Sequence, residues 1–176
     1  DQGTVKMGTG RSPWTGEAIS GDHIKAEAQA GRMGQQLYAV GIKKPGGFPF
    51  RAPTPEDEAA YEKAVKELAK RRPAWEAKGL VQTEKRFIGP SDRLENYGIL
   101  FFDSMFLPRQ LLGLVTAVEA LLDLRPTLTA QIPDPDRREA IDAYLALCLS
   151  KAAVYNSIQC KWHVSREVIT VMFHSK

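Results

Sequence analysis

The chain has 176 residues, 43% apolar and 26% charged, a balance that supports one sizeable hydrophobic core and excludes a disordered tail. Its 24 basic and 21 acidic residues leave a net charge of only +3, so any contact with nucleic acid must come from local clusters of cations. Two cysteines, Cys148 and Cys160, are too few for a disulfide framework or a four-thiolate zinc site.

The sequence shows neither a membrane segment nor a signal peptide. It has no run of about 18 uncharged apolar residues, and Asp1 to Thr4 supply neither a basic start nor an apolar region. Free thiols suit a reducing compartment, so we expect a cytoplasmic protein with no membrane partner. The chain begins without methionine and its apolar pattern continues to Phe173, so we expect an internal piece of a longer protein.

Residues 1–53 predict a small glycine-rich lobe. Seven glycines between Gly3 and Gly34 favour turns over long helices. Residues 36–42 and 48–52 are short apolar segments on either side of a Lys-Lys-Pro-Gly-Gly turn, a pattern typical of a β-hairpin whose second strand lies at a sheet edge.

The next segment predicts a helix and then a connection. Thr54 is placed to cap a helix whose first residue is Pro55, with acidic residues in its first turn. The helix is expected to end near Arg72, before a proline. Residues 74–96 are mixed in polarity and predict a connection with one short strand over residues 81–87.

Two further long helices are predicted. Pro108 lies in the first turn of a strongly apolar helix, expected to be the most buried in the fold and to stop before Pro126. Asp134 caps a second helix that begins at Pro135, and the two helices should pack as a pair. Residues 165–173 predict a last helix.

These elements predict an α+β fold. A small N-terminal β or irregular lobe with a hairpin, residues 1–53, is followed by a mainly helical region, residues 54–176.

The sequence carries no recognisable catalytic motif. It has no phosphate-binding or dinucleotide-binding glycine loop and no Gly-x-Ser-x-Gly elbow. His23, His163 and His174 lie far apart, without the spacing of a helical metal pair. Cys160 is next to Lys161 and near His163, so it is either an activated thiol or a buried structural cysteine.

Three segments are candidates for nucleic-acid binding. In the first, Lys63, Lys66 and Lys70 share one helix face, but Glu62 and Glu67 accompany them. The alternative is a solvated face with ion pairs from Glu62 to Lys66 and from Lys63 to Glu67.

The second segment runs from Cys160 to Arg166 and interleaves cations with the aromatic ring of Trp162. Lys161 and Arg166 could hold phosphate while Trp162 stacks on a base. The alternative is that Trp162 packs in the core and Arg166 pairs with a carboxylate.

The third segment contains Lys25 and Arg32. Arg32 lies next to Gly31, in a Gly-Arg-Met-Gly sequence where backbone and guanidinium can approach a phosphate together.

Three strings of residues, in this order along the chain, resemble those of one protein family. The first is His23 to Gly34 (HIKAEAQAGRMG). The second is Tyr97-Gly98 with Asp103 to Leu112 (DSMFLPRQLL), and the third is Tyr155-Asn156-Ser157 with Cys160 to Ile169 (CKWHVSREVI). In this order and spacing they are similar to the large adenine-specific DNA methylases that contain a zinc ribbon. The resemblance covers about residues 16–173.

The resemblance implies an internal, non-catalytic region. In that family the cofactor-binding glycine motif lies upstream of these strings and a Pro-Pro-Tyr type motif lies downstream, and this sequence contains neither. No cofactor is therefore expected in this region, and S-adenosylmethionine is implied for the longer protein. The implied partners are DNA and the catalytic domain of the same chain.

The candidate DNA-binding residues are Lys25, Arg32, Arg109, Lys161, Trp162, His163 and Arg166. Two alternatives stay open. One is a purely structural helical insertion that packs on the catalytic domain without touching DNA, and the other is a small enzyme that uses Cys160.

This sequence departs from the family pattern at the start of the chain. Where the family carries a Cys-x-x-Cys knuckle of its zinc ribbon, this sequence has Ser12 and Thr15 with Trp14 between them. Two hydroxyls cannot replace two zinc-binding thiolates. We therefore expect a degenerate ribbon without a metal.

Overall fold

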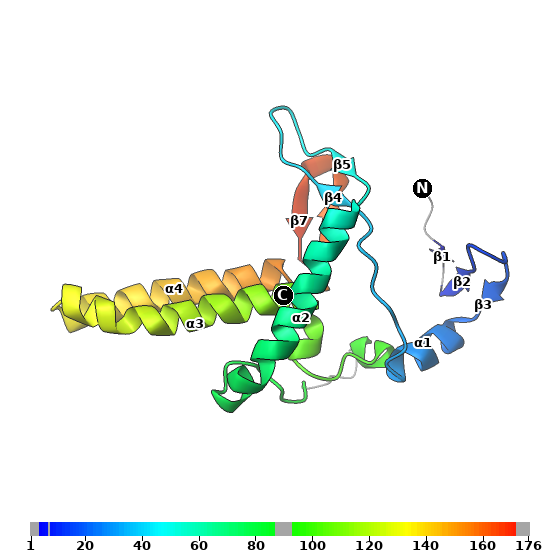
Figure 1. Ribbon diagram of the computed structural model, residues 1–176. Helices are drawn as coiled ribbons and strands as arrows, with labels where there is room; N and C mark the ends of the chain where they lie inside the picture. The colour runs from blue at the N-terminus through cyan, green and yellow to red at the C-terminus, as the bar shows by residue number, and fades with distance from the viewer. Residues whose placement is uncertain (1–3, 7, 87–92, 172–176) are drawn as a thin grey trace. The chain divides into compact units, whose positions relative to one another are not determined.

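The computed structural model describes residues 4–6, 8–86 and 93–171, and they form two compact units. The first unit takes the described residues of 1–36 and 84–104, and the second takes those of 37–83 and 105–176. The fold is α+β, as predicted, with short antiparallel sheets and four α-helices in the described part of the chain (Figure 1). The predicted boundary after residue 53 rests on composition and stays a prediction.

The first unit contains a three-stranded antiparallel sheet and a short helix. Strand β2 lies between β1 and β3. Helix α1 is capped by the Ser20 hydroxyl, which accepts a hydrogen bond from the backbone N–H of His23 at 3.2 Å. The elements are β1 (Val5–Lys6), β2 (Thr9–Arg11), β3 (Ala18–Ile19), α1 (Gly21–Gln29) and the 3₁₀ helix η1 (Leu94–Tyr97).

Helix α1 packs closely on the turn that follows η1. Ala28 is buried, and Gly98 has a left-handed backbone with φ of 73°. A Cβ atom at Gly98 would lie 2.5 Å from the carbonyl oxygen of Ala28. Only glycine fits at this position, because any side chain would collide with backbone.

The second unit contains three long helices and two hairpins. Its elements are β4 (Val40–Gly41), β5 (Phe50–Arg51), α2 (Pro55–Ala77), α3 (Pro108–Gln131), α4 (Pro135–Tyr155), β6 (Lys161–His163), the 3₁₀ helix η3 (Val164–Arg166) and β7 (Val168–Thr170). A further 3₁₀ helix, η2 (Asp103–Met105), precedes α3.

The predicted hairpin over residues 36–52 is confirmed, although its strands are short. Val40 pairs with Arg51 and Gly41 with Phe50 in an antiparallel register. The turn between them contains Lys43 and Lys44, as the sequence indicated.

Helix α2 begins where it was predicted but ends later. Thr54 and Asp57 form a capping box, and Pro55 is the first helical residue. The predicted end at Arg72 is wrong, because the helix continues through Pro73 to Ala77. A proline inside a helix lowers the stability of the helix by about 3 kcal/mol. Truncating a buried tryptophan lowers protein stability by about 3–5 kcal/mol, so the burial of Trp75 compensates for the cost of Pro73.

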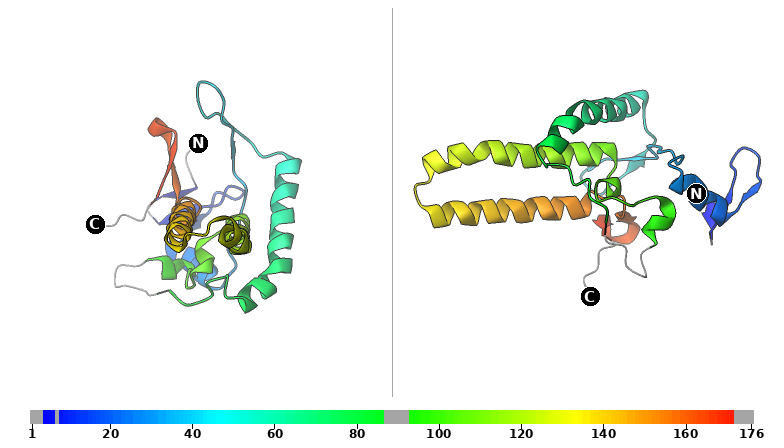
Figure 2. Two further views of the ribbon diagram at one scale, coloured as in Figure 1. Left: turned by 90° about the vertical axis from the view of Figure 1, so that its left-hand side faces the viewer. Right: turned by 90° about the horizontal axis from the view of Figure 1, so that it is seen from below.

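Helices α3 and α4 form an antiparallel pair, as predicted, and they run side by side in Figure 1 and in the right-hand view of Figure 2. The predicted stop before Pro126 is wrong, since α3 continues to Gln131. Arg125 pairs with Asp142 of α4 at 3.3 Å, so contact with the partner helix supports the turn that contains the proline. The predicted cap is confirmed, because the Asp134 carboxylate accepts the backbone N–H of Asp136 at 3.0 Å.

The predicted strand over residues 81–87 is wrong for its described part, residues 81–86, and Phe87 lies outside the described residues. Lys85 forms only an isolated bridge with Phe101. Val81 packs into the core of the second unit and is 6% exposed. Tertiary burial, and not pairing with a strand, therefore fixes the start of this segment.

The predicted last helix over residues 165–173 is also wrong over its described part, which ends at Val171. Residues 161–170 form an antiparallel hairpin in which Trp162 pairs with Ile169 and His163 with Val168. The chain reverses through η3 and Glu167, whose φ of 48° is left-handed. A short run of β-branched residues, Val168 to Val171, favours a strand once a partner strand is available.

The core of the second unit lies where α2 crosses α3. Trp75 is 2% exposed, and Phe106, Leu80 and Leu112 pack around the buried cluster. The buried residues of this cluster are Leu68, Trp75, Val81, Leu111 and Val115. Helices α2 and α3 each contribute two of them, so both helices supply this core.

A cluster of polar side chains lies at the same crossing of α2 and α3. The Glu119 carboxylate accepts hydrogen bonds from the Trp75 indole, from Lys78 at 3.4 Å and from Arg71. The Arg71 guanidinium also lies 4.3 Å from the centre of the Trp75 ring. The Trp75 hydrogen bond is the largest of the effects that lower the pKa of Glu119.

We predict that Trp75→Ala lowers the free energy of unfolding by about 3–5 kcal/mol, because it opens a cavity at the α2–α3 crossing. Urea denaturation followed by circular dichroism measures this. The matched control is Trp14→Ala, since Trp14 is 91% exposed and its loss should change the free energy by less than about 0.5 kcal/mol. Equal effects of the two variants would contradict this assignment of the core.

We predict that Glu119 makes stability fall in acid. Its pKa is lowered by folding, so its contribution is fully present above the ordinary pKa of 4.5 and is lost as pH falls through the lower folded value. Glu119→Gln should flatten the loss of unfolding free energy below about pH 4.5. Glu62→Gln, at an exposed position of α2, is the control and should leave the slope as it is.

Candidate functional site

The two hairpins of the second unit pack against each other through aromatic rings. The Trp162 ring of β6 lies 5.5 Å from the ring of Phe48 and 5.2 Å from that of Phe50, the latter edge to face. We call the two segments together, residues 40–51 and 161–170, the paired hairpins. Trp162 is half-buried, so the structure uses it for packing while part of its surface stays exposed.

The turns of the paired hairpins also meet. A Cβ atom at Gly47 would lie 3.4 Å from a carboxylate oxygen of Glu167, so the turn after β4 lies against the turn before β7. These turns carry Lys43, Lys44 and Arg166, all exposed. Basic side chains that are distant in the sequence are therefore brought to neighbouring turns.

Charge on the paired hairpins is strongly one-sided. The two segments contain five cations, Lys43, Lys44, Arg51, Lys161 and Arg166, and one acidic residue, Glu167. The Arg51 guanidinium is engaged by Asp57 at 2.5 and 3.0 Å, and these bonds hold the pKa of Asp57 well below its usual range. The other four cations form no ion pair within the described part of the chain.

His163 also belongs to the paired hairpins, but its side chain is less exposed than those of the four cations. Its Nδ1 atom lies 3.3 Å from the Ser165 hydroxyl, and its side chain is half-buried. It contributes to the turn of the hairpin that presents Arg166.

Arg109, the second residue of α3, lies at a different place in the second unit. It lines a cavity of about 340 Å³ together with Asp57, Tyr61 and both residues of β4. Asp57 in that cavity is already paired with Arg51. Arg109 is exposed and forms no ion pair with any residue that the structure describes.

The candidates Lys25 and Arg32 belong to the first unit, and both have carboxylate partners. Lys25 pairs with Asp22 at 3.1 Å. Arg32 makes two hydrogen bonds of 2.7 Å to Glu27. Hydrogen bonding to Arg32 is the largest of the effects that lower the pKa of the Glu27 carboxyl. Their charges are therefore compensated locally, unlike those of Lys161 and Arg166.

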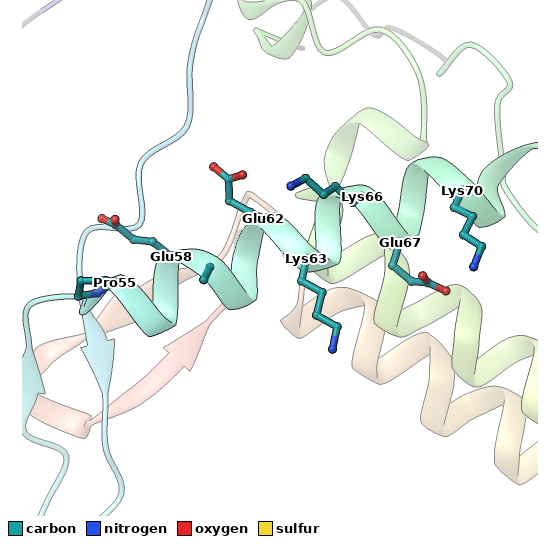
Figure 3. A pocket seen from close by; sticks show the side chains of 8 residues that line it. Pro55, Glu58, Glu62, Lys63, Lys66, Glu67 and Lys70 are labelled. Atoms are coloured by element: carbon teal, nitrogen blue, oxygen red, sulfur yellow. The ribbon is translucent and has the colours of Figure 1, made fainter.

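The lysine face of α2 carries both signs of charge. Figure 3 shows Lys63, Lys66 and Lys70 on the same stretch of α2 as Glu58, Glu62 and Glu67. The predicted ion pairs from Glu62 to Lys66 and from Lys63 to Glu67 are not formed among the described side chains. The face is solvated and close to neutral, so it offers no cationic site.

Cys160 lies between the end of α4 and the start of β6, where its contacts are structural. Its Sγ atom donates to the carbonyl oxygen of Val154 at 3.1 Å and lies 3.6 Å from the hydroxyl of Ser157, which is 3% exposed. No hydrogen bond joins Cys160 to His163 in the part of the chain described. This geometry favours the structural alternative over an activated thiol.

The predicted ribbon remnant is held by hydroxyl groups. The Ser12 hydroxyl accepts the backbone N–H of Trp14 at 3.3 Å and of Thr15 at 3.1 Å, and the Thr15 hydroxyl donates to Glu17 at 3.1 Å. Across residues 4–6, 8–86 and 93–171, no three His, Cys, Asp or Glu side chains are grouped as metal ligands. In the same residues, no helix combines the length and apolar composition needed to cross a membrane.

Searches of protein-family models, of curated proteins and of solved structures found no match to this chain.

Sequence reasoning missed Lys43 and Lys44 as candidates. The signal was present, since two lysines precede Pro-Gly-Gly at a hairpin turn, but they were interpreted only as part of that turn. Their significance depends on the second hairpin, which the sequence did not predict.

Proposed function

We propose that this chain is a non-catalytic internal region of an adenine-specific, S-adenosylmethionine-dependent DNA methyltransferase, and that its paired hairpins contact the DNA backbone. The observation that carries the proposal is the set of cations on two packed hairpins, Lys43, Lys44, Lys161 and Arg166, which have no carboxylate partner among the described residues. The longer protein would be the enzyme, and this region would not catalyse.

Phosphate is the group that such a surface suits best. Exposed lysine and arginine side chains on neighbouring turns bind a polyanion by releasing its counterions, and they require no particular base sequence. A methyltransferase that extrudes an adenine must hold the surrounding backbone meanwhile. Exposed cations on packed hairpins can supply that grip without taking part in the methyl transfer.

Packing among the family-like strings supports the proposed parentage. The turn at Gly98 fits against Ala28, which lies in the first string. The backbone N–H of Ile158, next to the third string, donates to the carbonyl oxygen of Met105 in the second string at 2.9 Å. Strings that are distant in the sequence therefore form joint structural contacts, which is expected of segments that belong to one inherited framework.

Trp162 positions the cations in this proposal. Its ring joins β6 to the turn that carries Lys43 and Lys44 through Phe48 and Phe50. Base stacking by Trp162 is not needed, and the half-buried ring favours the positioning role. Lys25 and Arg32, which are paired with carboxylates, are assigned no major share of the binding energy.

S-adenosylmethionine is assigned to the catalytic domain of the longer protein. This chain has no glycine-rich loop to receive the cofactor and no Pro-Pro-aromatic motif to orient an exocyclic amine.

The second candidate function is a structural insertion that packs on the catalytic domain without touching DNA. It is favoured by the ion pairs of Lys25 and Arg32 and by the contacts of Trp162 with phenylalanine rings.

We predict that the chain binds a duplex oligonucleotide with an affinity that falls steeply as salt rises. The double variant Lys161→Gln and Arg166→Gln should reduce the slope of log affinity against log salt by about 2, since each lost phosphate contact removes about 0.9. Fluorescence anisotropy over a series of salt concentrations measures this.

The matched control is the double variant Lys63→Gln and Lys66→Gln, which removes the same charge from the mixed face of α2. It should leave the slope close to that of the original chain. Absence of binding would favour the structural insertion, and equal weakening by both double variants would refute the paired hairpins as the contact surface.

We further predict that the gene encoding this chain also encodes a glycine-rich cofactor loop upstream of it and a Pro-Pro-aromatic motif downstream. Sequencing the flanking coding regions checks this directly. Flanks that lack both motifs would refute the methyltransferase parentage while leaving the DNA-binding measurement to stand by itself.

A further inference from the structure

The central part of helix α4, residues 143–149, is apolar on every side, yet no residue of the helix is buried. A helical segment of this composition is normally enclosed by the rest of a fold. Tyr144 is 71% exposed and Leu147 is 65% exposed. The side chains that face α3, such as Ile141 and Leu145, are only half-buried, and the opposite side is left open.

The exposed side of α4 has an uncharged centre between charged ends. Residues 143–150 contain no charged side chain. Small residues, Ala140 and Ala143, lie close to Tyr144 and Leu147 at helical spacing, which permits close approach of another helix. Exposed Glu139 precedes this centre and exposed Lys151 follows it. In the right-hand view of Figure 2, α4 has α3 along one side and no other helix of the second unit along its opposite side.

The pattern is self-complementary when a second copy runs antiparallel. A two-fold axis near residues 145 and 146 sets Tyr144 opposite Leu147 of the second copy. The same register sets Glu139 close to Lys151 of the second copy, twice by symmetry. A parallel pairing would instead place Glu139 against Glu139 and Lys151 against Lys151, which is repulsive.

We propose that the exposed side of α4 is a homodimer interface in which two copies pack antiparallel about residues 145 and 146. The apolar centre supplies the favourable burial, and the pairs of Glu139 with Lys151 fix the direction. The α3–α4 pairs of the two copies would form a four-helix arrangement, which encloses the apolar side of α4 that a single copy leaves in water. This inference is independent of the proposed DNA contact, because Lys43, Lys44, Lys161 and Arg166 do not belong to α4.

Sedimentation equilibrium of the full chain under reducing conditions tests the proposal. A concentration-dependent dimer is expected, and Tyr144→Glu should raise its dissociation constant by about tenfold or more, as expected for an aromatic residue at the centre of an interface. The matched control is Tyr38→Glu, since Tyr38 is 77% exposed but lies outside α4. Circular dichroism checks that both variants retain their helices.

A charge exchange tests the antiparallel register. Glu139→Lys should weaken the dimer roughly 2- to 30-fold, because two attractive pairs become repulsive. Adding Lys151→Glu to the same chain should restore the affinity. A chain that stays monomeric, a dimer that Tyr144→Glu does not weaken, or a charge exchange that fails to restore affinity would each overturn the proposal.

Discussion

The crossing of α2 and α3 at Trp75 determines the geometry of the whole second unit. Its indole is enclosed by apolar side chains of both helices, while its N–H and the Arg71 guanidinium on its face lead to Glu119. This fixes the course of α2, whose first turn holds β5 through the pairing of Asp57 with Arg51. It equally fixes α3, which carries α4 and the second hairpin. The two hairpins can meet only because the helices that bear them are locked at this crossing.

Local chemistry fixes where the helices begin, and long-range packing determines where they end. The caps at Thr54 and Asp134 each depend on a side chain that reaches backbone within three residues, so a short stretch of sequence contains all the information. Pro73 and Pro126 also look like stops at that range. Both are overridden by partners distant in the sequence, the enclosure of Trp75 and the pairing of Arg125 with Asp142. A proline predicts a cost, and only the tertiary structure shows whether that cost is compensated.

The candidate site was predictable to the extent that its residues act alone. Lys161 and Arg166 were identified as cations in a short aromatic segment, which needs no knowledge of the fold. The strand pairing of Trp162 with Ile169 was not predictable, because the periodicity of residues 165–173 fits a helix as well as a strand. Once that pairing is known, the turn that follows Lys43 and Lys44 is seen to lie against the turn at Glu167, which follows Arg166. The compensation of Arg32 by Glu27 likewise depends on the turn between them, which a linear pattern does not specify.

The two proposed contacts of the second unit should respond to salt in opposite ways, which separates them physically. If the cations on the paired hairpins bind phosphate through counterion release, an increase in any monovalent salt weakens that contact. The proposed association through the uncharged centre of α4 would remove apolar surface from water, an effect that sulfate strengthens. The charges that flank this centre are screened, yet they set direction more than affinity. An increase in sulfate concentration should therefore release the oligonucleotide while the association of two copies persists or tightens, and a loss of both together would mean that one surface serves both contacts.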